Sequence, residues 1–270
     1  MPASTMRAGI RTASILRNGI GPTVMLRTEL DVLPVLEKTD LPFASKATAK
    51  TRNDDITPVA YAYACGHDIH MSSWYGAARI MAENRAQWRG TLMLKGQPAE
   101  EIVAGAAAMI KDGLFTRFKK PDYALSMHDE GTLPSGFVDY HAGYFRVVKG
   151  EAQASNAQKE LIVDIGRGTD AVYNDPALTK RMAKAVRGAV GKDQVAAVVE
   201  MPAKMTSEDF SVYGQNGVKA VLLHVGAVPA EKLAAAKKRY PVARHAFAAM
   251  GTGVRADAEG DDCRRNRDPV

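Results

Sequence analysis

The stretch that organises this sequence is Tyr63-Ala64-Cys65-Gly66-His67-Asp68-Ile69-His70. If the stretch is extended, Cys65 and His67 point to the same side, because alternate side chains of a strand share a face. Gly66 lets the backbone come close to whatever the two side chains hold. A thiolate and an imidazole are an ordinary first pair of ligands for zinc or a similar metal. The alternative interpretation is a structural cysteine beside surface histidines, since short motifs also occur by chance.

Composition limits the classes of function. The chain has 270 residues, 46% of them hydrophobic and 24% charged, which is typical of a soluble globular protein. The net charge of +6 is scattered and forms no dense basic patch, so we expect no nucleic-acid partner. No apolar run reaches the length of a signal peptide or a membrane span, so we expect no membrane association. The only two cysteines, Cys65 and Cys263, indicate no disulfide framework and favour the cytoplasm.

Working outward from the motif, apolar runs that favour strands alternate with helical patterns. Residues 23–30 predict a buried strand that leads to Asp31, and residues 91–94 predict another that leads to Glu100 and Glu101. A third run, residues 122–127, ends at His128. The helical pattern of residues 71–88 follows the motif, and Asp175-Pro176 is a typical helix start. Asn18-Gly19 is a hairpin signal between the first two apolar runs, although Gly21-Pro22 lengthens the loop.

Metal-ligating residues therefore follow several predicted strands. Open α/β sheets bind ligands beyond the carboxyl ends of their strands, so we expect these side chains to converge at one edge. The fold predicted is α/β, a three-layer α/β/α sandwich with a mixed, mostly parallel sheet. The thiolate, imidazoles and carboxylates together form the donor inventory of a two-metal site.

Three segments also resemble one family closely. They are Gly21-Pro22-Thr23-Val24-Met25-Leu26-Arg27-Thr28-Glu29-Leu30-Asp31-Val32-Leu33-Pro34, then Ala64-Cys65-Gly66-His67-Asp68-Ile69-His70, then Gln97-Pro98-Ala99-Glu100-Glu101. They resemble bacterial hippurate hydrolases, which are N-acyl-amino-acid amidohydrolases of the aminoacylase and carboxypeptidase superfamily. Tyr173-Asn174-Asp175-Pro176 and Met205-Thr206-Ser207-Glu208-Asp209-Phe210 extend the resemblance, which covers residues 10–255 or thereabouts.

The resemblance implies a zinc-exopeptidase-like catalytic domain that cleaves the amide bond of small N-acyl amino acids. It implies two divalent ions, for which Zn, Mn, Co and Ni all suit the ligands. By position, the implied metal ligands are Cys65, His67, Glu101, His128 and, through a looser match, His245. Glu100 resembles the general base, and Asp31 resembles the carboxylate that orients a ligand imidazole.

The sequence also departs from the family pattern. The family inserts a lid domain, which mediates dimers and contacts substrate, at a place where this chain has only a short linker near residues 146–160. We therefore expect one catalytic domain over residues 1–256, a charged disordered tail over residues 257–270, and apolar surface that favours self-association. In the loop of His128, Asp129-Glu130 adds negative charge close to the implied metals.

Two other functions stay open at this point. Loss of the lid could leave a metal-binding remnant without efficient turnover. Alternatively, Cys65 could act as the nucleophile of a metal-independent hydrolase with a histidine as its base. That second hypothesis leaves Glu100 and Glu101 without a role.

Overall fold

The structure is a computed structural model of the whole chain. It describes residues 13–33, 37–50, 58–60, 65–146, 170–190, 197–204 and 208–239, and the statements below concern these residues. The predicted tail at 257–270, the linker of the predicted lid deletion beyond Arg146, and His245 lie outside them. None of the helices in these ranges has the length and apolar character needed to cross a membrane.

A mixed sheet forms the centre of the fold. Its strands, in spatial order, are β1 (Ala13–Asn18), β5 (Gly90–Gln97), β2 (Thr23–Glu29), β6 (Tyr123–Pro134), β11 (Lys219–Val228), β7 (Val138–Tyr140) and β10 (Val198–Glu200). Four of the six pairings are parallel, and only β1–β5 and β7–β11 are antiparallel. The predicted α/β class with a mostly parallel sheet is thus confirmed.

The first two strands do not form the hairpin that Asn18-Gly19 signals, because β5 lies between them. Burial gives the physical reason. Strands β2 and β5 are buried along most of their length and so occupy inner positions, whereas β1 is half exposed and forms an edge. The chain reaches β5 from β2 through helix α1 (His67–Glu83) and the short 3₁₀ turn η2 (Arg85–Gln87), so β2 and β5 run parallel.

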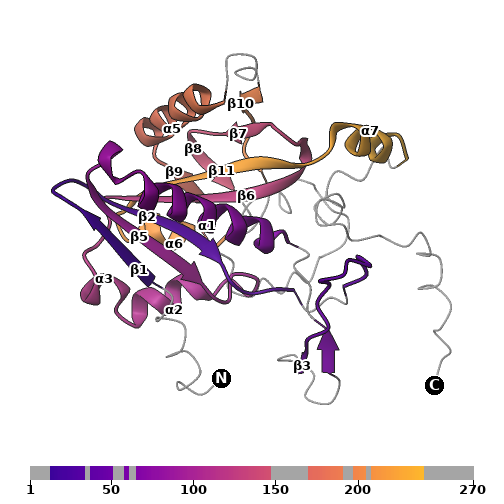
Figure 1. Cartoon of the computed structure of the whole chain (residues 1–270), viewed down its shortest axis with the longest axis horizontal. Coiled ribbons are helices and arrows are strands. Elements are labelled where there is room, and N and C mark those ends of the chain that lie inside the picture. The colour runs from indigo at the N-terminus through magenta and orange to yellow at the C-terminus, as the bar shows by residue number, and fades with distance from the viewer. Residues whose placement is uncertain are drawn as a thin grey trace, which may run out of the picture.

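Helices cover both faces of the sheet, with α1 in front and α6 (Ser211–Gln215) behind in Figure 1. The apolar core lies on the side of α2 (Gly105–Lys111), α3 (Leu114–Arg117) and α6. Met25, Met93 and Leu222 from the sheet pack there with Leu114 and Tyr213 from the helices. On the other face, the indole of Trp74 in α1 donates a hydrogen bond of 3.0 Å to the carbonyl of Leu26 in β2.

The remaining helices are α5 (Pro176–Ala189) and α7 (Ala230–Arg239). The predicted start of α5 is confirmed, because Asp175 is the N-cap, its carboxylate accepts from the amide of Leu178, and Pro176 follows in the first turn. Two small antiparallel ribbons complete the fold. One joins β3 (Thr48–Lys50) to β4 (Pro58–Ala60), and the other joins β8 (Gly143–Arg146) to β9 (Val172–Asn174).

Candidate metal centre

The implied ligands collect where β2 and β5 end. These neighbouring parallel strands finish at Glu29 and Gln97, so Asp31 and the pair Glu100-Glu101 leave the sheet at the same edge. Helix α2 begins only at Gly105. A turn that contains both glutamates therefore precedes α2, and it brings their carboxylates toward the N-terminus of α1.

The Cys-Gly-His motif is a turn into a helix, so the condition of an extended segment is not met. Cys65 lies in the turn, Gly66 is the N-cap with φ 78°, and His67 opens α1, which begins four residues before the predicted helix at 71. The turn still achieves the expected convergence. Ligand atoms of Cys65, His67 and Glu101 all lie within 4.8 Å of one another.

His128 reaches the same place from inside a strand. The predicted strand end at His128 is wrong, because β6 continues to Pro134 and pairs with β11 past this point. The Asp129-Glu130 pair, which was expected to add negative charge close to the implied metals, has partners in the fold. Asp129 meets His70, and Glu130 accepts from Nζ of Lys204 at 2.6 Å. With its backbone in the sheet, His128 places Nε2 3.9 Å from Sγ of Cys65.

One imidazole nitrogen of His67 lies at the middle of this group. Its Nε2 is 3.7 Å from Oε1 of Glu101 and 3.8 Å from Oε2 of Glu100. Its Nδ1 donates to the backbone carbonyl of Asp31 at 2.8 Å, which leaves the lone pair on Nε2 directed at the carboxylates. Asp31 also accepts from the amide of Glu101 through Oδ2 at 2.9 Å. Asp31 thus aligns two implied ligands, one through its main chain and one through its side chain.

Charge is poorly compensated around these side chains. Burial, with Glu208 nearby, raises the pKa of Glu100 to about 9, although Arg27 opposes the shift. Burial and the charge of Asp31 raise the pKa of Glu101 to about 7, against a hydrogen bond from Cys65. Burial also lowers the pKa of His67. All three shifts disfavour the charged forms, as expected where ionisable groups lose water without gaining a counter-charge.

These residues fit a divalent metal. His67 Nε2 and Glu101 Oε1 are buried and make no hydrogen bond within the described ranges. Buried polar atoms rarely stay unpaired, so two of them facing each other indicate a missing partner. A cation coordinated by thiolate, imidazole and carboxylate would satisfy both atoms and neutralise the acids. The structure thus brings together Asp31, Cys65, His67, Glu100, Glu101 and His128, while His245 lies outside the described residues.

Sequence reasoning missed a second buried polar cluster, which adjoins the candidate ligands at Glu100. Arg27 is fully buried and its guanidinium contacts the carboxylates of Glu29, Glu208 and Asp209, the last two at 3.0 and 2.9 Å. Its Nε donates to Oε1 of Gln97 at 3.1 Å. Burial opposes the charge of Arg27, but Glu208 and Asp209 hold its pKa above the usual value. We call Arg27, Glu29, Gln97, Glu208 and Asp209 the arginine cluster.

The arginine cluster fastens the elements that carry the candidate ligands. Oδ2 of Asp209 accepts from the amide of Ala106 in the first turn of α2, and the hydroxyl of Tyr213 in α6 donates to Gln97. A signal for this cluster exists in the sequence. Arg27 and Glu29 are two positions apart in an otherwise apolar strand, so they share one buried face and require partners.

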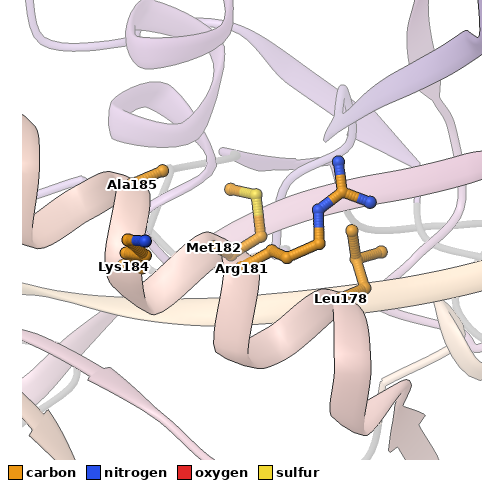
Figure 2. Close-up of a pocket in the computed structure, with 5 residues that line it drawn as sticks. All are labelled: Leu178, Arg181, Met182, Lys184 and Ala185. Atoms are coloured by element: carbon orange, nitrogen blue, oxygen red, sulfur yellow. The ribbon is translucent and has the colours of Figure 1, made fainter.

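The other histidines separate into distinct roles. His224 is fully buried, and its Nδ1 lies 2.9 Å from Asp139. His70 lies between two carboxylates, Glu29 and Asp129. A hollow of about 460 Å³ elsewhere in the molecule is lined by α5 residues alone and contains none of the candidate ligands (Figure 2).

Comparisons with known proteins agree with this geometry. The description "Peptidase family M20/M25/M40" applies to a family model that matches residues 25–250. The chain is 33% identical over 148 residues to an N-acetylcysteine deacetylase of Bacillus subtilis (strain 168), covering 55% of this chain and 33% of the relative. It is 37% identical over 131 residues to an N-acetyldiaminopimelate deacetylase of Lactobacillus helveticus (strain DPC 4571), covering 48% of this chain and 31% of the relative. The matches thus span about a third of the length of these curated relatives.

A solved structure supports the fold. The YXEP protein of Bacillus subtilis, described as a dinuclear metal binding peptidase from the M20 family, is similar with a TM-score of 0.61 and 20% identity. The similarity covers 92% of this chain and 90% of that chain.

Proposed function

The chain belongs to the peptidase family M20/M25/M40, and on this basis we propose that it is a metal-dependent amidohydrolase that cleaves small N-acyl amino acids. The observation that carries the proposal is the convergence of Cys65, His67 and Glu101, with His67 Nε2 and Glu101 Oε1 buried and unpaired. The relatives named as deacetylases of N-acetyl amino acids support this reaction class. N-acetyl and N-benzoyl amino acids, the latter including hippurate, are the substrates to compare.

Each side chain has a role in this proposal. Cys65, His67, Glu101 and His128 hold two divalent ions, with His245 as the remaining ligand from the family resemblance. Zn, Mn, Co and Ni all suit this donor set. Bound cations of this kind favour deprotonation of water and polarise an amide carbonyl.

Glu100 performs the proton transfers. Its Oε2 lies 3.8 Å from His67 Nε2, at the edge of the cluster, and burial raises its pKa to about 9 in the absence of cations. Bound cations would keep this carboxylate ionised at neutral pH, and it could then take a proton from water and deliver it to the leaving amine. Asp31 keeps His67 in the tautomer whose Nε2 is free to bind a cation.

The experiment combines metal analysis with an assay. Purified full chain is loaded with Zn²⁺, Mn²⁺, Co²⁺ or Ni²⁺, and release of amino acid is followed from N-acetylcysteine, N-acetyldiaminopimelate and N-benzoylglycine with and without chelator. We expect turnover that chelator abolishes and added metal restores. Absence of chelator-sensitive turnover on every N-acyl amino acid would overturn the proposal.

The β8–β9 ribbon favours a second candidate, a remnant that binds metal without efficient turnover. Strand β8 ends at Arg146 and β9 begins at Val172, which leaves little chain for the lid domain of the family. Tyr144 and Tyr173 of this ribbon are 62% and 47% exposed, which supports self-association at this surface. Insertion of a family lid after Arg146 should create activity in a remnant, whereas an equally active native chain would exclude this candidate.

The proximity of Cys65 to His128 favours the third candidate, a cysteine hydrolase. In that case a chelator would leave the rate unchanged, and Cys65→Ser would abolish both the rate and labelling by thiol reagents. Cys65 is in no disulfide among the described residues, which also supports our proposal of a reducing, cytoplasmic compartment.

A further inference from the structure

We infer that Asp129 is a positioning residue for the metal centre: with His70 and Glu29 it sets the spacing between the Cys65 turn and His128 and fixes the tautomer of His128. This inference rests on the proposed function only in taking Cys65 and His128 as metal ligands. Asp129 itself is not assigned as a ligand.

Three buried side chains form a chain across the sheet edge. Nδ1 of His70 lies 2.8 Å from Oε2 of Glu29, and its Nε2 lies 3.0 Å from Oδ1 of Asp129. Glu29 is anchored by Arg27, so the chain begins in the arginine cluster. The three residues come from β2, α1 and β6 and are between 0% and 6% exposed. Their positions are therefore set by one another and not by solvent.

The carboxylate of Asp129 packs directly against the motif turn. A Cβ atom at Gly66 would lie 2.1 Å from Oδ1 of Asp129, which is closer than any real contact. The glycine between Cys65 and His67 therefore admits the carboxylate of Asp129, in addition to providing the left-handed backbone with φ 78°. The position of Asp129 thus limits how closely the Cys65 turn approaches β6.

The main chain of Asp129 acts on His128. Its amide nitrogen lies 2.9 Å from Nε2 of His70, and its carbonyl accepts from Nδ1 of His128 at 2.5 Å. His128 therefore carries its proton on Nδ1, which leaves the lone pair on Nε2 for a cation at the side of Cys65. The carboxylate of Asp129 also faces this nitrogen, with Oδ1 3.5 Å from Nδ1 of His128. A change of the Asp129 side chain should consequently alter both the orientation and the tautomer of His128.

The first test replaces one oxygen of Asp129. In the full chain, Asp129→Asn keeps the size of the side chain, and Asp112→Asn is the matched control because Asp112 is exposed and pairs with Arg117 on the surface. We measure Co²⁺ affinity by titration, the thiolate-to-cobalt absorption band, and ¹⁵N-imidazole NMR of the metal-free protein. We expect Asp129→Asn to weaken Co²⁺ binding about 10- to 100-fold and to shift His128 away from the Nδ1-protonated form, with both signals unchanged in Asp112→Asn.

The second test approaches the same contact from the motif side. Gly66→Ala and Gly113→Ala both place alanine at a left-handed helix N-cap, with φ 78° and 90°. Their backbone strain is therefore similar, but only Gly66→Ala displaces the carboxylate of Asp129. We expect both variants to lose stability. Only Gly66→Ala should also bind Co²⁺ more weakly and shift His128 away from the Nδ1-protonated form.

The outcomes separate this inference from the proposed function. If the wild type binds Co²⁺ but hydrolyses nothing, the amidohydrolase proposal is contradicted. The inference about Asp129 is then still tested by the Co²⁺ affinities of Asp129→Asn and Asp112→Asn. If the wild type binds no Co²⁺, the NMR tautomer of His128 still decides, since it is read without metal. Equal affinity and equal tautomer in Asp129→Asn and Asp112→Asn overturn the inference. His70→Gln supplies a further check, because its effect and that of Asp129→Asn should be strongly non-additive.

Discussion

The arginine cluster and the candidate metal centre are neighbouring polar regions with opposite means of balancing charge. In the arginine cluster, Arg27 supplies a cation from the chain itself and contacts three carboxylates. In the candidate metal centre, burial and neighbouring carboxylates raise the pKa of Glu100 and Glu101, and His67 Nε2 and Glu101 Oε1 make no hydrogen bond in the described part of the chain. The difference teaches that the chain supplies its own cation in one region, whereas the donor set of the other fits a cation from outside the chain.

The largest expected effect comes from removing the internal cation. Arg27→Met leaves buried carboxylates without their counter-charge, and breaking a buried ion pair typically costs about 3–5 kcal/mol of unfolding free energy. Arg79→Met is the matched control, because Arg79 pairs with Glu83 on the exposed face of α1 and such pairs contribute about 0.3–0.5 kcal/mol. Urea unfolding with chelator present measures both. A similar loss of unfolding free energy in the two variants would contradict the stabilising role of Arg27 in the arginine cluster.

The next effect concerns the external cation. Zn²⁺ that binds only the folded state should stabilise the metal-free chain by about 2.7 kcal/mol at a free concentration 100 times its Kd. Glu101→Gln should remove most of this gain, and Glu83→Gln on the surface of α1 should keep it. Unfolding curves with and without Zn²⁺ provide the comparison. A full Zn²⁺ gain in Glu101→Gln would exclude Glu101 as a ligand.

A smaller effect should appear as pH dependence. The carboxyl of Glu101 has a usual pKa of 4.5 and a folded pKa of about 7, so between these pH values the folded state binds more protons than the unfolded state. Stability of the metal-free chain attributable to Glu101 therefore falls as pH rises from about 4.5 to about 7. The difference in urea midpoint between wild type and Glu101→Gln, followed over this range, isolates the contribution. A difference that stays constant with pH would argue against the raised pKa.

The smallest effect should lie outside both regions. Asp175→Ala removes the N-cap of α5 and should cost about 1 kcal/mol. Because Asp175 contacts neither cluster, Zn²⁺ should stabilise this variant as much as the wild type. A changed Zn²⁺ gain would show that the metal centre depends on the fold as a whole and less on its own contacts.

The sequence predicted the fold and the candidate metal centre to different extents. The local sequence pattern identified the strands β2 and β5, the first part of β6 and the start of α5, because these features depend on neighbouring residues. It placed the polar residues at the correct sheet edge, since parallel strands share the direction of their carboxyl ends. The hairpin expected at Asn18-Gly19 was wrong because burial of β2 and β5 outweighed the local turn signal.

Long-range partners explain the remaining misses. Asp129 and Glu130 were expected to add negative charge close to the implied metals, but His70 and Lys204, distant in the chain, pair with them inside the sheet. Arg27 and Glu208 are separated by 181 positions, and no local pattern reports their contact. The assignment of His245, the extent of the catalytic domain and the tail stay predictions.

The β8–β9 ribbon has a consequence for how such chains diverge. Arg146 and Val172 are partners across this ribbon, so the chain departs and returns about one strand spacing (~4.8 Å) apart. Doubling the length of a segment closed in this way costs only about 0.6 kcal/mol of extra closure entropy. A segment of a different length, up to a whole domain, could therefore be inserted at this ribbon without changing the order of the strands in the central sheet.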